Sequence, residues 1–158
     1  MTAVRPSAAL LITGQELLLG LVADANTQFL AHELDAIGIE LRRVSIVGDA
    51  HEEIVAGLRE LSGHDLVITS GGLGPTHDDR TVGAVAEVAA AELVLDEELL
   101  EAIAAITAAF ARRRGTDPAL NRDGDRKQAL VPRGATVIPP AGTAPGLLLA
   151  LGAGHVIV

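Results

Sequence analysis

The chain has 158 residues, 49% of them hydrophobic, and a formal net charge of −9 at pH 7, which together predict one globular domain over residues 1–158. The acidic balance, the single lysine (Lys127) and the two aromatic residues (Phe29 and Phe110) argue against nucleic-acid binding, because basic patches and stacking platforms are missing. Since the chain has no cysteine, disulfides, thiol catalysis and cysteine metal sites are excluded.

Short apolar runs alternate with helical patterns through the first half of the chain. Two apolar runs bounded by turn residues predict buried strands at 8–13 and 66–68, and the β-forming residues at 39–47 predict a strand between them. A helical pattern follows each predicted strand, and the side chains predicted to face the sheet are Phe29, Leu30, Leu34 and Ile37, then Ile54, Leu58 and Leu61, and finally Val82, Val85, Ala86 and Ala89. Residues 14–20 are predicted to form a turn. Three strand–helix repeats predict an α/β fold with a parallel sheet between helices.

One long helix and several short strands are predicted in the second half. The helix begins at Asp96 and ends at Gly115, with Leu99, Ile103, Ile106 and Phe110 on one face. Three arginines at 112–114 suit the negative end of the helix dipole, and a phosphate clamp is the alternative interpretation. We expect a polar loop at 116–126, a strand and turn within 127–134, and strands at 135–138, 147–151 and 155–158. The chain ends inside an apolar run, so truncation of the domain is one interpretation of this boundary.

Three of the predicted loops are expected to meet at one edge of the sheet. In parallel sheets ligands bind beyond the carboxyl ends of the strands, and those ends lie at Thr13–Gly14, Gly48–Asp49 and Ser70–Gly71. The third loop contains Gly71, Gly72 and Gly74 and leads into a helix. Backbone N–H groups that converge at a helix N-terminus form an anion site, so we predict a phosphate there, with a simple tight turn as the alternative.

Two adjacent aspartates follow these glycines. Asp78 and Asp79 would repel a bound phosphate unless a divalent cation lay between them, so they predict Mg²⁺ or a similar hard cation. In the alternative interpretation, one of the two only caps the helix. His77 is interpreted as solvent-facing. The spacing matches neither the dinucleotide motif G-x-G-x-x-G nor a P-loop.

Neither a signal peptide nor a membrane span is expected. The N-terminus lacks a charged-then-apolar layout, and the longest uncharged apolar stretch, near residues 147–158, is short and interrupted by glycine. A soluble cytoplasmic protein with no membrane partner is therefore the expectation.

Six segments, taken together, resemble a known family. They are 14–20 (Gly-x-Glu-Leu-Leu-Leu-Gly), 24–26 (Asp-x-Asn), 47–49 (Val-Gly-Asp), 70–79 (Ser-Gly-Gly-Leu-Gly-Pro-Thr-His-Asp-Asp), 127–132 (Lys-Gln-Ala-Leu-Val-Pro) and 142–146 (Gly-Thr-Ala-Pro-Gly). Their content and order resemble the N-terminal domain of the CinA (competence/damage-inducible protein A) family, which is similar to the molybdopterin-binding domain of the MoaB/MogA family. The resemblance covers nearly the whole chain, and its specific parts are the glycine–aspartate motif and the 142–146 loop.

The resemblance implies a three-layer α/β/α sandwich with a mixed, mostly parallel sheet, the MogA/MoaB-like molybdopterin-binding fold. In molybdenum-cofactor enzymes this fold binds molybdopterin and adenylylates it with ATP and Mg²⁺. In the CinA branch the resemblance implies hydrolysis of ADP-ribose at its pyrophosphate, with a divalent metal such as Mg²⁺, Mn²⁺ or Co²⁺.

The resemblance also implies roles for single residues. Asp79 and Asp78 are the expected catalytic carboxylates that hold the metal, and Lys127 is expected to contact a phosphate. Gly142 and Thr143 are expected to give the ligand an amide and a hydroxyl. The expectation for Asp49 is a metal or a ribose hydroxyl, or alternatively a helix cap. Glu16 is expected to act as a general base or second metal ligand, or alternatively as a buried structural hydrogen-bonding group.

Three functional hypotheses stay open. The chain is a metal-dependent hydrolase of nucleotide pyrophosphates such as ADP-ribose, a molybdenum-cofactor enzyme, or a non-catalytic module that binds a nucleotide or pterin. Leu73 favours the first, because the MogA branch usually has threonine there. The pair Asp78 and Asp79 favours an enzyme over the third hypothesis, whereas a Pro-Gly-Val-Pro loop that follows in the family lies beyond Val158 and favours the third. Gln15 stands where the family often has aspartate or serine, so this position offers no carboxylate ligand. The family habit and the alanine-rich long helix predict a homo-oligomer, either a dimer or a trimer.

Overall fold

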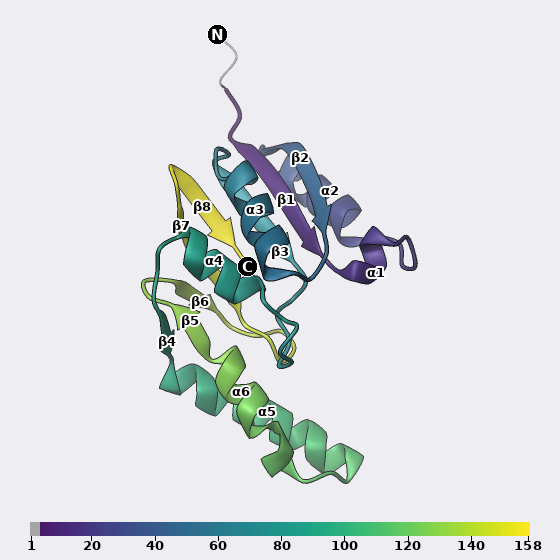
Figure 1. Cartoon of the computed structure of the whole chain (residues 1–158), viewed down its shortest axis with the longest axis vertical. Coiled ribbons are helices and arrows are strands. Elements are labelled where there is room, and N and C mark those ends of the chain that lie inside the picture. Colours follow the sequence, from purple (N-terminus) through teal and green to yellow (C-terminus); the bar gives the residue numbers. More distant parts are fainter. Residues whose placement is uncertain (1–3) are drawn as a thin grey trace.

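The computed structural model describes residues 4–158 and is built on one six-stranded sheet (Figure 1). The strand order across the sheet is β2-β1-β3-β8-β7-β6. The strands are β1 (Ser7–Thr13), β2 (Glu40–Val47), β3 (Leu66–Ser70), β6 (Thr136–Ile138), β7 (Gly146–Leu151) and β8 (Gly154–Ile157). Strands β2, β1, β3 and β8 are parallel, whereas β7 runs antiparallel to both of its neighbours. The predicted mixed, mostly parallel sheet is therefore confirmed.

Helices cover both faces of this sheet. Helices α3 (His51–Leu61) and α4 (Thr81–Val88) lie on one face and α2 (Asn26–Ala36) lies on the other, as Figure 1 shows. The central strand β1 is buried on both sides, because alternate residues point to opposite faces of a strand. Its Ala9 and Leu11 belong to the larger core under α3 and α4, and its Leu10 packs with Leu34 of α2. The three-layer α/β/α fold is confirmed.

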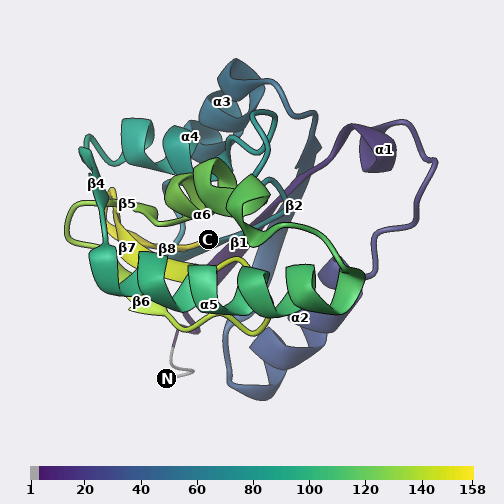
Figure 2. The ribbon, with the colours of Figure 1, turned by 90° about the horizontal axis from the view of Figure 1, so that it is seen from below.

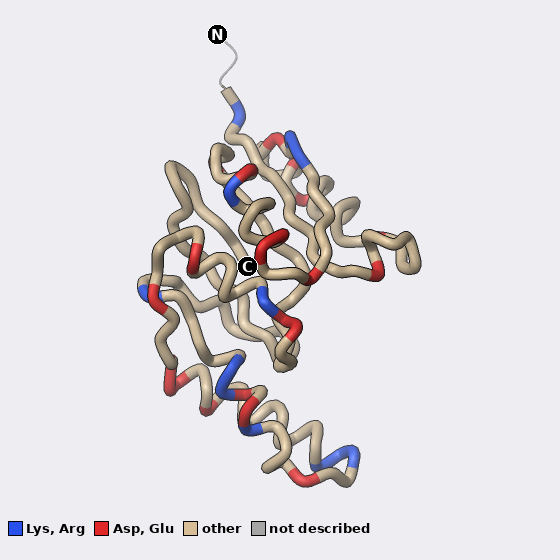
Figure 3. The backbone as a smooth tube through the Cα atoms, in the orientation of Figure 1, with Lys and Arg blue, Asp and Glu red and all other residues tan. Residues whose placement is uncertain are grey.

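The second half of the chain adds an arm below the sheet. It contains β4 (Leu93–Leu95), α5 (Glu97–Arg114), a 3₁₀ helix at Pro118–Asn121, α6 (Arg122–Gln128) and β5 (Leu130–Pro132). Strands β4 and β5 pair antiparallel in a separate two-stranded sheet. Figures 1 and 2 show α5 and α6 side by side. The predicted helix ends of α5 are confirmed: Asp96 accepts a hydrogen bond from Leu99 N at 2.9 Å, and Gly115 ends the helix with φ 68°. The acidic start and the basic end of α5 are visible in Figure 3.

Two predictions for the arm are wrong. Residues 116–126 are not a loop, because Asp117 caps the 3₁₀ helix by accepting from Ala119 N, and α6 follows it directly. Lys127 lies on α6 and not on a strand. The buried face of α6 carries the polar side chains of Asp125 and Gln128, so no apolar stripe marks this helix in the sequence.

Some apolar side chains are more exposed than their spacing predicts. Phe29 and Ile37 were expected to face the sheet from the first helix, yet they are 63% and 71% exposed, and Leu34 is the buried residue of α2. Phe110, expected on the packed face of α5, is 44% exposed. The predicted turn at 14–20 contains a short helix, α1 (Gln15–Leu18). In the described residues, no helix combines the length and the apolar character that crossing a membrane requires.

Candidate functional site

The carboxyl ends of three parallel strands form the edge that the sequence predicts. Strand β1 lies between β2 and β3, with Thr13 opposite Val47 and Ile12 opposite Ser70. The loops that leave these strands therefore start side by side, and Gly14 N donates to Val47 O at 3.1 Å. These loops provide the groups of the candidate site.

Gly71 and Gly72 allow the third loop to pack closely against its neighbours. Both have positive φ, 106° and 67°. A β-carbon on Gly71 would overlap the backbone carbonyl of Thr13, and one on Gly72 would overlap the hydroxyl of Thr81 at the start of α4. Thr81 Oγ1 donates to the carbonyl of Gly71 at 2.8 Å, and Thr81 N donates to the carbonyl of Gly72 at 3.2 Å. Within residues 4–158 the N–H groups of Gly71, Gly72 and Gly74 have no acceptor, which leaves them available for an anion.

One hydroxyl contacts both aspartates of the loop. Thr76 Oγ1 lies 2.6 Å from Asp79 Oδ2 and also hydrogen-bonds with Asp78 Oδ1, while Thr76 N donates to Asp79 Oδ2 at 2.9 Å. The hydrogen bond from Thr76 lowers the pKa of Asp78, so this carboxylate is charged at neutral pH. A hydroxyl has one proton and can donate to only one carboxylate at a time. The pair therefore keeps acceptor capacity for a further partner.

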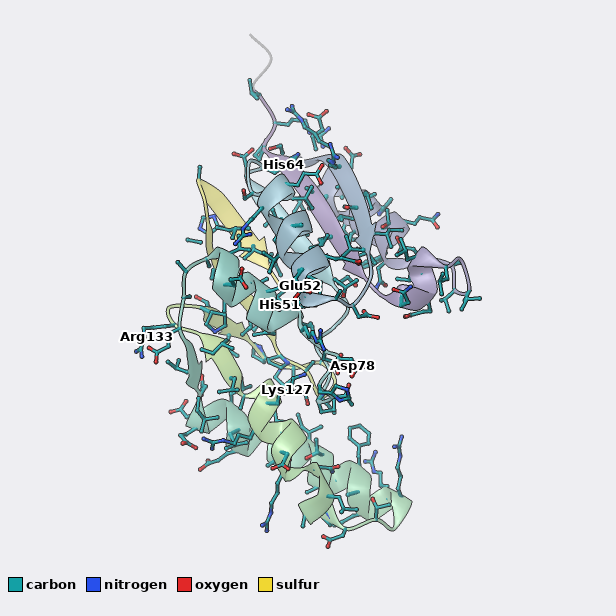
Figure 4. All side chains as sticks on the ribbon, viewed as in Figure 1. His51, Glu52, His64, Asp78, Lys127 and Arg133 are labelled. Carbon is teal, nitrogen blue, oxygen red and sulfur yellow. The ribbon has the colours of Figure 1, made fainter. Side chains whose placement is uncertain are left out.

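Lys127 hydrogen-bonds to the backbone of the loop at 71–80, which we call the aspartate loop. Its Nζ donates to the carbonyls of Gly74 at 3.3 Å, Asp79 at 2.6 Å and Thr76. Partial burial lowers the pKa of Lys127, and the charges of Asp79 and Asp78 oppose that shift. Figure 4 shows Lys127 reaching from α6 toward the loop that carries Asp78. All three protons of an ammonium group can be used by these carbonyls, so a contact of Lys127 with phosphate stays a prediction.

Asp49 and Glu16 lie at the two neighbouring loops. Asp49 Oδ2 accepts from Gln15 N at 3.0 Å, so Asp49 ties the second loop to the start of α1 and does not cap its own helix. Glu53 Oε2 accepts from Gly48 N at 3.0 Å. Glu16 is exposed, against the alternative of a buried group, and its carboxylate lies over Gly14, where a β-carbon would be 3.1 Å from Oε1. Glu16 is thus free to meet a ligand at the edge.

The 139–145 loop contributes to a cavity that Pro75 and Thr76 also line. Thr143 lines a cavity of about 580 Å³ together with Pro75 and Thr76. Gly142 is exposed, with no atom within 4 Å of a β-carbon built on it. Thr143 thus shares a cavity with the loop that carries the aspartates, and Gly142 is not among the residues that line it.

A second cavity, of about 240 Å³, lies on the α4 side of the loop. Gly72, Gly74, Asp79, Lys127 and His77 are among the residues that line it. His77 is exposed, as interpreted, although it borders this cavity.

Three residues of the site were not predicted. Gln128, which is buried, donates through Nε2 to Leu73 O at 2.9 Å and so holds the glycine turn. Thr76 and Asn26 lie within the segments 70–79 and 24–26, but no role in the site was predicted for either side chain. Asn26 Nδ2 donates to Ser70 Oγ at 2.8 Å and joins α2 to the end of β3. The position of Gln128 directly after Lys127 was the available signal for its role.

The side chains present fit a hard cation bound together with a ligand. In residues 4–158 no group of three or more His, Cys, Asp or Glu side chains is arranged to hold a metal. The candidates are the two carboxylates Asp78 and Asp79, whose oxygens are the donors that Mg²⁺ prefers. Mg²⁺ is commonly bound by one or two carboxylates with phosphate and water oxygens, so this pair suffices when a phosphate ligand is also bound.

Comparison with known sequences identifies relatives. Residues 9–158 match the family described as "probable molybdopterin binding domain". A CinA-like protein from Mycobacterium sp. (strain JLS) is 47% identical over 145 residues, covering 90% of this chain and 34% of that protein. A CinA-like protein from Mycobacterium tuberculosis (strain H37Rv) is 45% identical over 156 residues, covering 93% and 36%. The chain thus spans about a third of the length of the curated relatives it matches.

Solved structures share this fold. CinA from Thermoplasma acidophilum, described as having unknown function, superposes with a TM-score of 0.80 at 34% identity and covers 97% of this chain and 86% of its own. MoaB from Thermus thermophilus gives a TM-score of 0.58 at 20% identity, covering 96% of this chain and 79% of its own. MogA gives 0.57 at 19% identity, covering 96% and 81%. The MoaB and MogA similarities show the fold alone.

Proposed function

Because the chain belongs to the molybdopterin-binding domain family, and within it to the CinA-like proteins, we propose that it binds a nucleotide pyrophosphate with a divalent metal and hydrolyses the phosphoanhydride. ADP-ribose is the proposed substrate type. One observation carries the proposal: the N–H groups of Gly71, Gly72 and Gly74, which have no acceptor among residues 4–158, lie on the same loop as the carboxylates of Asp78 and Asp79. Amide donors suit phosphate oxygens, and the carboxylates suit a hard cation bound together with a phosphate ligand.

Each group of residues in the site has its own role in the proposed hydrolysis. The glycine N–H groups donate to non-bridging phosphate oxygens and stabilise the charge that grows on them in the transition state. Asp78 and Asp79 would hold the metal, which would supply Lewis-acid polarisation of the phosphoryl oxygens and offset their charge. Glu16, exposed at the edge, accepts the proton of the attacking water. The water oxygen bonds to phosphorus, the bridging P–O bond breaks, and ADP-ribose gives AMP and ribose 5-phosphate.

Lys127 acts on this site through the loop. Its hydrogen bonds to the carbonyls of Gly74, Thr76 and Asp79 fix the backbone that carries the donors and the carboxylates. Lys127 is thus a positioning residue in the proposal.

The test is chromatography of ADP-ribose after incubation with the protein and Mg²⁺, Mn²⁺ or Co²⁺. The informative variant is Asp79→Asn, because the asparagine amide oxygen still accepts from Thr76 and the loop keeps its shape. Glu101→Gln, an exposed carboxylate on α5, is the control for loss of one charge. We expect AMP from the wild type and Glu101→Gln with metal, and none from Asp79→Asn. Equal release by all three proteins, or no release with any metal, would refute hydrolysis at this site.

A second candidate function is molybdopterin binding or adenylylation. The family description and the fold shared with MoaB and MogA favour it. Tight binding of a pterin that competes with ADP-ribose, without release of AMP, would favour this function, and binding of ADP-ribose alone without turnover would indicate a non-catalytic module.

A further inference from the structure

The α5–α6 arm contains a buried carboxylate that the proposed hydrolysis does not use. Asp125 of α6 is 5% exposed and lines the cavity of about 580 Å³ that the arm forms with Pro75, Thr76 and Thr143. None of the glycines and aspartates that serve the phosphates and the metal in the proposed hydrolysis lines this cavity. A molecule bound by Asp125 therefore occupies a place of its own, apart from the phosphates.

One oxygen of this carboxylate has no partner. Asp125 Oδ2 lies 3.0 Å from Thr107 Oγ1, whose single proton is shared with the carbonyl of Ala104 at 3.3 Å. In the described part of the chain, no hydrogen bond and no ion pair reaches Oδ1. The unpaired side-chain oxygens that are sealed from solvent are those of Thr27 and Thr69, so Asp125 Oδ1 is accessible from the cavity. Because a buried carboxylate is costly without donors, this oxygen favours a positively charged donor group.

An arginine without a partner lines the same cavity. Arg114, in the last turn of α5, makes no side-chain hydrogen bond and no ion pair with any of residues 4–158, Asp125 included. Arg114 and Thr107, the residue that contacts Asp125, lie seven residues apart on α5, so about 10 Å separate their positions along the helix axis. The cavity thus carries a negative group and a positive group at separate positions, and both are left for a ligand.

Apolar side chains line the cavity together with these charged groups. Phe110 and Ala111 lie between Thr107 and Arg114 on α5, and Leu120 belongs to the 3₁₀ helix. Phe110 is 44% exposed and Leu120 is 78% exposed, so the core of the protein does not use this apolar surface. Burying such surface against a ligand is favourable, and an aliphatic chain that joins two charged ends suits this lining.

We propose that this cavity is a separate ligand site for an aliphatic zwitterion, whose ammonium donates to the Asp125 carboxylate and whose carboxylate accepts from the Arg114 guanidinium. A simple amine would leave Arg114 without a partner and a simple acid would leave Asp125 without one, whereas a zwitterion gives both a charge-assisted hydrogen bond. A metal cation is disfavoured, because no group of three metal-binding side chains includes Asp125 within residues 4–158. Amino acids with the two charges at opposite ends of the chain are the simplest members of this ligand class.

The test is calorimetric titration of the protein with 5-aminopentanoate, pentylamine and pentanoate. The last two compounds each lack one charged group of the first. We expect the wild type to bind 5-aminopentanoate about tenfold more tightly than either of them, as one hydrogen bond between charged groups permits. Glycine should bind more weakly than 5-aminopentanoate, because its charged groups lie too close together to reach Asp125 and Arg114 at once.

Two substitutions assign the charged groups, and each has a matched control. Asp125→Asn should reduce the preference for 5-aminopentanoate over pentanoate to about one, because the ammonium loses its partner. Arg114→Gln should do the same to the preference over pentylamine. Asp123→Asn and Arg113→Gln make the same changes at exposed positions of the same two helices, outside the cavity lining, and should keep both preferences.

Each outcome decides the proposal. If the wild type does not bind 5-aminopentanoate, or binds it no more tightly than pentylamine or pentanoate, the proposal is overturned, and this result needs no variant to fold. Preferences that Asp125→Asn and Arg114→Gln leave unchanged, with intact circular dichroism, overturn it also. If Asp125→Asn does not fold, the wild-type ratios and Arg114→Gln decide.

These results do not depend on the proposed hydrolysis, because its phosphates are placed outside this cavity. Binding of 5-aminopentanoate through Asp125 and Arg114 by a protein that releases no AMP from ADP-ribose leaves the zwitterion site standing while hydrolysis fails. Release of AMP by a protein that does not bind 5-aminopentanoate gives the reverse result.

Discussion

Substituting Gly72 with alanine tests whether this glycine is required by the protein or by a ligand. Gly72 has φ 67°, a backbone conformation that favours glycine. A β-carbon there would overlap Thr81 Oγ1, and Thr81 is fully buried. The next atoms are Thr13 Oγ1 at 3.2 Å and Thr81 Cβ at 3.4 Å, so most of the conflict comes from one hydroxyl oxygen.

The free-energy cost can be divided between backbone and overlap. A non-glycine residue in the left-handed region costs about 1–3 kcal/mol, and overpacking a tight site costs another ~1–3 kcal/mol. We expect Gly72→Ala to lower the free energy of unfolding by about 2–6 kcal/mol in the wild type. In a Thr81→Ala background only the backbone part should remain, about 1–3 kcal/mol. Thr81→Ala alone should cost about 1 kcal/mol, because it removes the 2.8 Å hydrogen bond to Gly71 O.

Urea unfolding followed by circular dichroism measures these values. Intrinsic tryptophan or tyrosine fluorescence cannot be used, since the chain has neither residue. Gly63→Ala is the matched control, because a β-carbon on Gly63 meets no atom within 4 Å. If Gly72→Ala costs the same with and without the Thr81 hydroxyl, the reasoning from overlap is refuted. Without these unfolding measurements, a loss of activity in Gly72→Ala could not be assigned to weaker phosphate binding, because the change in packing would lower activity as well.

Three further predictions concern the loop, its support and the sheet. Lys127→Met should lower the free energy of unfolding by ~1–3 kcal/mol, because three backbone carbonyls lose their donor; urea unfolding measures it, and no change would mean that water replaces the ammonium. Gly124→Ala lies in helix α6, where propensity alone predicts a gain of about 1 kcal/mol. We expect a net loss in urea unfolding instead, because the β-carbon would lie 2.6 Å from Pro75 Cβ, and a gain would refute the contact. Hydrogen bonds from Ser7 lower the pKa of Asp65, so their stabilisation is present above the usual carboxyl pKa and is lost as pH falls through the lower, folded value. The melting temperature of Asp65→Asn should therefore fall less in this acidic range than that of the wild type, and parallel curves would contradict the linkage.

Much of the sheet could be predicted from the sequence, because β1, which is buried on both faces, and β3 appear as short apolar runs, whereas the more exposed β2 was recognised from its β-forming residues. The same logic failed for α6, whose buried face carries Asp125 and Gln128 and contains Gly124. Periodicity also misjudged Phe29, since an amphipathic pattern gives the apolar side of a helix but not how much of it the sheet covers.

The candidate site could be predicted in its residues but not in their partners. Asp78 and Asp79 were recognised as a pair, whereas the hydroxyl of Thr76 that contacts both depends on loop geometry. The sequence likewise could not indicate that the Lys127 ammonium meets backbone carbonyls, because that contact joins segments about fifty residues apart.

The two borders of the main sheet have a consequence for the behaviour of the protein at high concentration. Strand β2 is one border, with Arg42 and Arg43 in ion pairs with Glu40 and Glu60 and with a register irregularity opposite Ala8 and Ala9. Strand β6, the other border, has three residues and is followed by two prolines. Charges, irregular pairing, short length and proline all hinder the addition of a foreign strand. The main sheet should therefore resist extension by a strand from another molecule, even at high protein concentration.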